Sequence, residues 1–483
     1  MDKTNEKERR NSLSNPDDYI RVAIVGNVDS GKSTLVGVLT KGQSDDGRGS
    51  ARLKVFNYPH EAQNGRTSSI AQEIMGFDEN GEQIFAERFV QSKNKYWAEV
   101  VGRSKKIVAL VDLCGHEKYL KTTMLGMVGL VPDYVLIVIG ANLGLSRMTK
   151  EHLGIALALN LPFMIVMTKT DMVSDEILKQ TMSDLTKLLN ANIVGKKPLV
   201  IDYETKPTND DLISEMKDFN VNSNKLSEKE EQLLDKAVDA INSERICPIF
   251  KVSSVSGEGV AQLTRFLYKL KSRTGFNKDM SNKSAPVEFD IHEKFVVQGI
   301  GLVVSGLLKS GTVTTNTQLL MGPTKMNEYK QVSVRSIHFN RVPVDEVYSG
   351  QFCTLALKPL KKKEEIDKND LRKGVVLLDN SLMPKPCWGF DAEVSILHHS
   401  STILPGYEAV MHCGVIRQSV RIVKMDRELL RSGDKGLITF KFMFNSEYLK
   451  PDSTFLLREG RTKILGVISK VYNKLEEVPS VTN

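Results

Sequence analysis

Short runs of apolar residues alternate with polar loops and helix-length segments through the first half of the chain. Four of these runs cover residues 19–25, 106–111, 133–139 and 162–167. Runs this short, separated by segments long enough for a crossover helix, are typical of buried strands in a parallel sheet. We therefore expect a doubly wound α/β domain with a mostly parallel sheet over residues 19–275.

The pattern changes near Pro286 to short segments in which apolar and polar residues alternate with period two between frequent glycines. This alternation is typical of half-buried strands, so it predicts all-β structure. We divide it into two domains, residues 286–385 and residues 386–474. The polar residues 1–18 and the last residues, 475–483, are expected to be tails.

Composition narrows the class of protein without identifying it. The chain has 483 residues, of which 41% are hydrophobic and 26% charged, as in ordinary globular proteins. The five cysteines are scattered and form no C-x-x-C pair, which favours reduced thiols in the cytoplasm over a zinc site or a disulfide framework. No apolar run is long enough to cross a bilayer, and the formal charge of +7 permits a nucleic-acid partner without requiring one.

The first apolar run leads directly into a Gly-x4-Gly-Lys-Ser sequence, and a helix-like segment follows. This order of strand, glycine-bounded loop and helix predicts a phosphate-binding P-loop. Glycines let the backbone N–H groups surround an anion, the lysine neutralises the β- and γ-phosphates, and the serine hydroxyl binds Mg²⁺. The residues that we assign to the nucleotide here are Gly26, Asn27, Val28, Asp29, Ser30, Gly31, Lys32, Ser33 and Thr34.

A long loop without periodicity, residues 41–69, follows this helix and ends in Gly65-Arg66-Thr67-Ser68-Ser69. Loops of this length inside a compact domain are usually functional or disordered. In P-loop switches, a hydroxyl from such a loop joins the Mg²⁺ shell only while the γ-phosphate is present. Spacing alone does not choose between the three hydroxyls at Thr67, Ser68 and Ser69.

The second apolar run ends in Asp112-Leu113-Cys114-Gly115-His116. An aspartate at the end of a strand suits a second acidic contact to Mg²⁺, and Gly115 leaves its N–H free for the γ-phosphate. His116 follows, and we expect it to lie beside the position of an attacking water. We therefore predict His116 as the catalytic residue that orients this water.

Two further loops predict recognition of guanine. Thr168-Lys169-Thr170-Asp171 follows a strand, at the sheet edge where open parallel sheets bind ligands. Asp171 would accept the N1–H and the 2-amino group of guanine, which adenine does not offer. Ser253-Ser254-Val255 follows another strand, and its backbone would meet the guanine O6. Together the motifs predict GTP or GDP with Mg²⁺ as ligands.

The chain resembles the translational GTPases, the group of elongation factors Tu and 1-alpha, because its Asp-x-x-Gly is followed directly by His116. Four segments look more closely like the GTP-binding protein 1 and 2 family: residues 42–49, residues 65–69, residues 116–123 and residues 148–154. The resemblance extends from residue 19 to about 472. It implies a P-loop GTPase domain followed by two all-β barrel domains.

The resemblance also implies roles for single residues. Asp29 matches an aspartate linked to a structural monovalent cation, and Val28 matches one side of an apolar gate beside the histidine. Ser69 matches the switch hydroxyl of the wider class, so that Ser33, Ser69 and Asp112 would bind Mg²⁺, with Thr67 as the competing choice. Thr168 replaces the asparagine that is usual in the guanine motif.

The function implied by the resemblance is that of an elongation factor-like GTPase that delivers aminoacyl-tRNA to the ribosome in its GTP form. No arginine finger in cis is obvious in the sequence, so we expect slow intrinsic hydrolysis that the ribosome stimulates. The alternative is a GTPase of ribosome rescue or mRNA surveillance that carries a protein partner. In either case we expect a cytoplasmic monomer without a membrane partner.

Overall fold

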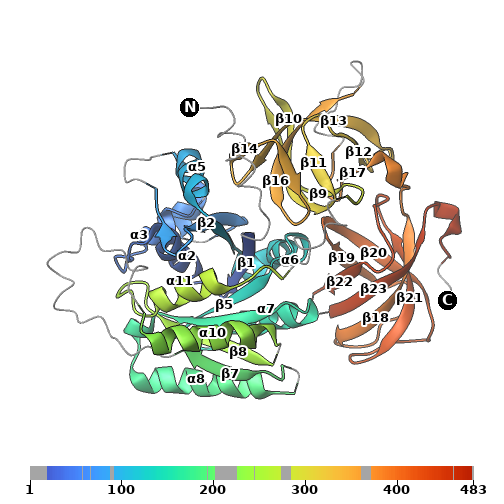
Figure 1. Cartoon of the computed structure of the whole chain (residues 1–483). Helices are drawn as coiled ribbons and strands as arrows, with labels where there is room; N and C mark the ends of the chain where they lie inside the picture. The colour runs from blue at the N-terminus through green and yellow to red at the C-terminus, as the bar shows by residue number, and fades with distance from the viewer. Residues whose placement is uncertain are drawn as a thin grey trace. The chain divides into compact units, whose positions relative to one another are not determined.

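The computed structural model describes most of the chain (Figure 1). The described residues are 19–56, 58–65, 67–86, 92–192, 194–201, 226–243, 245–273, 284–360, 371–460 and 462–480. They form two compact units, one within residues 17–127 and 131–274 and the other within residues 275–483 together with residues 128–130. The predicted tail at residues 1–18 lies outside the described residues, as does Arg66.

The first unit is built on an eight-stranded sheet in the order β3-β2-β4-β1-β5-β6-β8-β7. The strands from β4 to β7 run parallel, whereas β2 is antiparallel to β4 and β3 is antiparallel to β2. The strands are β1 (Tyr19–Gly26), β2 (Ala71–Phe77), β3 (Gln83–Ile84), β4 (Lys106–Asp112), β5 (Tyr134–Gly140), β6 (Phe163–Thr168), β7 (Lys197–Ile201) and β8 (Ile246–Val252).

Helices connect these strands, as the sequence pattern predicts. The α-helices are α2 (Lys32–Lys41), α3 (Ser50–Leu53), α4 (Pro59–Asn64), α5 (Lys93–Arg103), α6 (Leu120–Gly129), α7 (Arg147–Ala158), α8 (Asp175–Asn190), α10 (Glu228–Asn242) and α11 (Val260–Lys269). Two short 3-10 turns, η2 (Glu117–Tyr119) and η3 (Thr170–Met172), follow strands that carry motifs. No described helix is long and apolar enough to cross a membrane.

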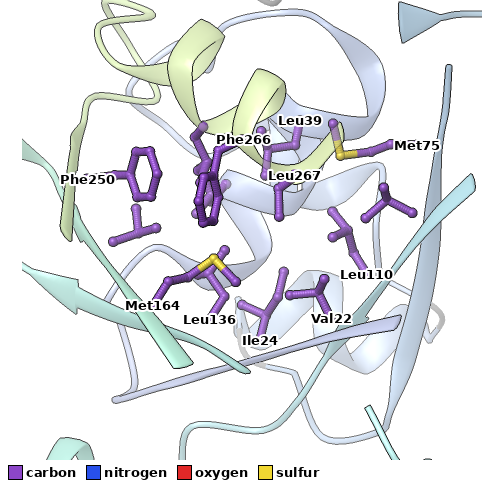
Figure 2. Close-up of a cluster of buried hydrophobic side chains, with 14 of the residues drawn as sticks. Val22, Ile24, Leu39, Met75, Leu110, Leu136, Met164, Phe250, Phe266 and Leu267 are labelled. Carbon is purple, nitrogen blue, oxygen red and sulfur yellow. The ribbon is translucent and has the colours of Figure 1, made fainter. Parts of the chain in front are cut away.

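One face of the sheet packs against α2, α10 and α11 and forms the main core of the first unit. Alternate residues of β1, among them Val22 and Ile24, point into this cluster, where they meet Phe266 and Leu267 of α11 (Figure 2). Because successive side chains of a strand point to opposite faces, this alternation fixes the register of β1. That register places Gly26 at the end of the strand, where the P-loop begins.

The second unit contains two closed barrels of antiparallel strands. In the first barrel β12 pairs with both β17 and β13, which closes the ring, and β14 extends it beside β13. Its strands are β9 (Glu288–Val297), β10 (Gly301–Ser310), β12 (Gln318–Gly322), β13 (Lys330–Phe339), β14 (Val342–Val344), β16 (Phe352–Pro359) and β17 (Val376–Leu378), with a separate ladder of β11 (Thr312–Thr314) and β15 (Glu346–Tyr348).

The second barrel has the strand order β18-β21-β20-β19-β22-β23, and β18 pairs with β23 to close it. Its strands are β18 (Gly389–His398), β19 (Glu408–Cys413), β20 (Ile416–Met425), β21 (Lys435–Phe442), β22 (Thr454–Glu459) and β23 (Thr462–Tyr472). Its interior holds stacked and edge-on aromatic rings around Phe390. The predicted fold class, an α/β domain followed by two all-β barrels, is thereby confirmed. The residue limits assigned to the domains stay predictions.

A buried ion pair joins the two barrels. Arg372, which precedes β17 of the first barrel, donates from Nη1 to both carboxylate oxygens of Glu447 at 2.8 Å. Gln418 of the second barrel donates to the same carboxylate at 2.7 Å, and Glu447 is 1% exposed. A carboxylate this deeply buried is stable only while these donors remain in place.

Candidate nucleotide site

The P-loop turns sharply between β1 and α2, and two glycines make the turn possible. A Cβ on Gly26 would lie 2.3 Å from the carbonyl oxygen of Val138, which real side chains do not tolerate. Gly31 directly precedes α2 with a φ of 86°, a left-handed conformation that favours glycine. The loop therefore brings its backbone and the N-terminus of a ten-residue helix to one point, where an anion is stabilised.

An open cleft lies over this loop, within the first unit. Its lining brings together residues of the P-loop, of the long loop after α2 and of the segment after β4. The lining residues are Val28, Asp29, Gly31, Lys32, Ser33, Thr34, Arg52, Gly65, Thr67, Gly115 and His116. The structure thus joins three motifs that are separated by up to 88 residues in the sequence, from Val28 to His116.

Lys32 is held in the cleft as a nearly buried cation, with 6% of the residue exposed. Its Nζ donates to the carbonyl oxygen of Asn27 at 2.6 Å. Burial lowers the pKa of Lys32, and the nearby Asp112 carboxylate opposes this effect. A Cβ on Gly115 would lie 2.5 Å from Nζ, so the glycine of Asp-x-x-Gly leaves room for the lysine.

Three oxygen-bearing side chains converge beside Lys32. Ser33 Oγ donates to Asp112 Oδ2 at 2.6 Å and lies 2.8 Å from Thr67 Oγ1. The other carboxylate oxygen of Asp112, Oδ1, is buried and has no hydrogen-bond partner among the described residues. Burial raises the pKa of Asp112 to about 6, against the effect of Lys32 and of the two hydroxyls. Mg²⁺ prefers carboxylate and hydroxyl oxygens, so this cluster fits that ion.

Ser69, which we expected to contribute the switch hydroxyl, lies apart from this cluster and makes other contacts. Its Oγ donates to Glu61 Oε1 at 3.0 Å, and its backbone N–H donates to the same oxygen at 3.0 Å. Ser68 makes the same two kinds of hydrogen bond to Glu61, at 2.9 and 2.7 Å. The geometry therefore favours Thr67, the competing choice, as the hydroxyl that joins Ser33 and Asp112.

Replacing Thr67 by valine, which keeps the shape but removes the hydroxyl, should weaken GTP-analogue binding in the presence of Mg²⁺ by about 10-fold. GDP affinity should stay within about twofold, because the switch hydroxyl contributes only with the γ-phosphate. Titration with fluorescent nucleotides measures both affinities. Ser69→Ala is the matched variant and should retain the parent's affinity for both nucleotides. A larger loss of GTP-analogue affinity in Ser69→Ala than in Thr67→Val would restore the original assignment.

His116 directly precedes the η2 turn as its N-cap and lines the cleft with a half-buried ring. Its Nδ1 accepts the backbone N–H of Lys118 at 3.0 Å. An accepting Nδ1 places the proton of the neutral ring on Nε2. The ring therefore offers an N–H donor that can fix the oxygen of a water molecule.

In the first of the two loops predicted to bind guanine, Thr168 has a structural role. Its Oγ1 donates to the carbonyl oxygen of Ser30 at 2.6 Å, so it ties the end of β6 to the P-loop. Lys169 follows with a φ of 60°, and Asp171 is exposed in η3, as a base-binding carboxylate requires. Thr168 thus lacks the side-chain amide of the usual asparagine, and its hydroxyl instead links the predicted guanine motif directly to the P-loop.

The second loop predicted to bind guanine follows β8. Ser253 closes it, because its buried Oγ accepts the N–H groups of Val255 at 3.3 Å and Ser256 at 3.1 Å. Ser254 accepts the backbone N–H of Asp45 through its carbonyl oxygen at 2.8 Å. This hydrogen bond connects the loop after β8 to the long loop between α2 and β2, which contains Thr67.

Sequence reasoning missed three residues that organise this loop: Asp45, Arg52 and Glu61. The Asp45 carboxylate accepts the backbone N–H groups of Gly47, Gly49 and Ala51 at 2.9–3.1 Å. An acidic residue followed by alternating glycines is the signal that could have identified it, because such a loop turns its N–H groups towards one point.

Fold and site together define a P-loop GTPase followed by two β-barrels. A family model described as the elongation factor Tu GTP binding domain matches residues 17–272. GTP-binding protein 1 of Xenopus laevis is 41% identical over 460 residues, which are 95% of this chain and 64% of that protein. GTP-binding protein 2 of Mus musculus is 36% identical over 94% of this chain and 69% of that protein.

The chain belongs to the translational GTPases of the elongation factor Tu type, in the group that includes GTP-binding proteins 1 and 2. It spans less than two thirds of the length of the Xenopus protein. The crystal structure of a bacterial selenocysteine-specific elongation factor shares the fold with a TM-score of 0.61 at 18% identity, covering 93% of this chain and 58% of that one.

Proposed function

We propose that the protein hydrolyses GTP and delivers aminoacyl-tRNA to the ribosome while it is bound to GTP. The observation that carries the hydrolytic part is the convergence of Ser33, Thr67 and Asp112 beside Lys32, with His116 in the same cleft. Family membership supports the delivery part, because elongation factors of this type share the GTPase domain and the two barrels.

The phosphates of GTP bind where the P-loop and the N-terminus of α2 meet. Lys32 neutralises the β- and γ-phosphates, and the loop N–H groups donate to their oxygens. Ser33, Thr67 and Asp112 would hold Mg²⁺, which when bound neutralises charge that develops between the β- and γ-oxygens. Asp29, exposed in the loop with a φ of 58°, is the residue we assign to a monovalent cation.

Hydrolysis requires a water in line with the bond between the γ-phosphorus and the β–γ bridging oxygen. His116 donates from Nε2 to the oxygen of this water, which aims a lone pair at the γ-phosphorus. The products are GDP and inorganic phosphate. Loss of the γ-phosphate removes the anion around which Thr67 and its loop are ordered, and the loop then rearranges.

Asp171 and the loop at Ser253, Ser254 and Val255 select guanine. The carboxylate accepts two N–H groups that adenine does not present together, and a site left with an unpaired carboxylate rejects the wrong base strongly. The ribosome, which stimulates hydrolysis in this proposal, and aminoacyl-tRNA are the partners. The protein acts as a cytoplasmic monomer.

Filter binding of labelled aminoacyl-tRNA tests the delivery proposal. The purified chain is loaded with a GTP analogue, with GDP or with no nucleotide, at one fixed salt concentration, because phosphate contacts make affinity depend on salt. Binding that requires the GTP analogue and is lost with deacylated tRNA is the expected result. Equal or absent binding in all three states would overturn tRNA delivery and favour a protein cargo in ribosome rescue or mRNA surveillance.

A further inference from the structure

Arg52 is a cation in the nucleotide cleft that the motifs of the family do not include. It lies on α3, a single helical turn in the loop between the P-loop helix and Thr67. Its side chain lines the cleft together with Lys32, Thr67 and His116. The site therefore contains a second strongly basic group beside the P-loop lysine.

The Arg52 guanidinium lies against two glycines. A Cβ on Gly49 would lie 2.5 Å from Nε, and a Cβ on Gly65 would lie 3.2 Å from Nη2. Both glycines have left-handed conformations, with φ values of 93° and 65°. The guanidinium thus packs against the backbone at Gly49 and at Gly65, where the absence of a side chain leaves it space.

The charge of Arg52 is not neutralised within the described part of the chain. Two other arginines of the same domain have carboxylate partners: Arg265 pairs with Glu231 at 2.8 Å, and Arg103 pairs with Glu99 at 3.4 Å. Arg52 is half-buried and has no hydrogen bond or ion pair from its side chain among the described residues. Two cations that share one cleft repel each other unless an anion lies between them.

A phosphate group supplies that anion. The planar guanidinium presents several N–H donors in a fixed fork, which matches the oxygens of a phosphate in a bidentate arrangement. Arg52 packs against Gly65, two residues before Thr67, and the cleft beside it is lined by Gly115 and His116. Those residues surround the γ-phosphate in the proposed mechanism, whereas the P-loop backbone surrounds the β-phosphate.

We propose that Arg52 is a catalytic arginine supplied in cis, whose guanidinium contacts the γ-phosphate of GTP. Water attacks the γ-phosphorus, the bond to the β–γ bridging oxygen breaks, and GDP leaves with the electron pair, while the proton of the water passes to an oxygen of the phosphate that is formed. Arg52 stabilises the negative charge on the γ-phosphate oxygens during this transfer. The inference rests on the proposed GTP hydrolysis and is independent of tRNA delivery.

The test compares Arg52→Ala, Arg52→Lys and the parent chain, with Arg48→Ala as the control. Arg48 is the same residue type in the same loop, but its side chain is exposed and does not line the cleft. Affinities for a GTP analogue and for GDP are measured with fluorescent nucleotides. Hydrolysis is measured as single-turnover cleavage of labelled GTP, without ribosomes and in the presence of Mg²⁺.

Arg52→Ala should weaken GTP-analogue binding by about 10-fold and slow single-turnover hydrolysis by about 10²–10³-fold, while GDP affinity stays within about twofold. Arg52→Lys should recover most of the GTP-analogue affinity but little of the rate, because an ammonium lacks the bidentate fork. Arg48→Ala should behave like the parent chain in all three measurements.

Equal losses of GTP-analogue and GDP affinity in Arg52→Ala would overturn the γ-phosphate contact, and so would unchanged binding and hydrolysis. Unaltered GDP affinity shows that a variant is folded. If Arg52→Ala does not fold, the affinities and the hydrolysis rate of Arg52→Lys alone test the proposal. A parent chain that binds GTP without hydrolysing it would contradict the proposed function. In that case the ratio of GTP-analogue to GDP affinity still tests the contact by itself.

Discussion

Alanine in place of His116 should slow ribosome-stimulated GTP hydrolysis by about 10²–10⁴-fold, the range expected when a positioned proton-transfer or water-orienting group is removed. Nδ1 of this ring accepts the Lys118 N–H at 3.0 Å, so the remaining ring donor, Nε2–H, is available to the attacking water. Labelled GTP, pre-bound to the chain and mixed with ribosomes, measures the rate.

Nucleotide affinity separates loss of catalysis from loss of the fold in this experiment. GTP and GDP should bind His116→Ala within about twofold of the parent, because the ring donates to water rather than holding a phosphate. His116→Gln, which keeps a side-chain N–H donor, should recover part of the rate, and His338→Ala, an exposed histidine of β13, should change nothing. Parent-like turnover in His116→Ala would contradict the assignment of the catalytic residue.

Alanine in place of Lys32 should raise the dissociation constants of both GTP and GDP by about 10²–10³-fold. Removing one partner of a desolvated charge pair costs about 2–5 kcal/mol, and about 1.4 kcal/mol corresponds to a factor of ten. Lys32 is 6% exposed, so the solvent screens its interaction with the phosphates little. Equilibrium titration with fluorescent GDP and a fluorescent GTP analogue measures the effect.

Lys54→Ala is the matched control for Lys32, because Lys54 is an exposed lysine of the same unit that hydrogen-bonds Gln43 at 2.7 Å. It should bind both nucleotides like the parent. The loss at Lys32 should also be shared by GTP and GDP, unlike that at Thr67 or Arg52, since the lysine contacts the β-phosphate that both nucleotides carry. A dissociation constant within about threefold of the parent would show that the cleft does not hold the phosphates as proposed.

Strands and motifs could be predicted from the sequence because local pattern determines them. The apolar run 19–25 became β1, and the run 106–111 became β4, with one further residue at each C-terminal end. Where a strand is buried, only one register keeps its apolar side chains in the core. The motifs directly follow these strands in the sequence, so the register also positions the motifs. Because Lys32 follows β1 and Asp112 ends β4, their positions in the sequence were enough to predict that both lie at the same edge of the sheet.

The loop before β2 could not be predicted in the same way. Counting back from Ile70 treats the segment as extended and selects Ser69, whereas Glu61 of α4 draws Ser68 and Ser69 to itself through four hydrogen bonds. These are contacts between a helix and a loop without periodicity. The place of Arg52 in the cleft could not be predicted for a related reason. Its guanidinium lies beside Gly49 and Gly65, and the conformations of these glycines do not follow from any periodic pattern.

The pair of Arg372 and Glu447 limits how the gene for this protein can be rearranged. A recombination event that exchanged one barrel for an unrelated one would leave either a guanidinium or a carboxylate alone in a dry junction. Such an orphaned charge costs about 3–5 kcal/mol, a large part of the stability of a typical domain. By this argument, exchanging the two barrels together should cost less stability than exchanging either one alone.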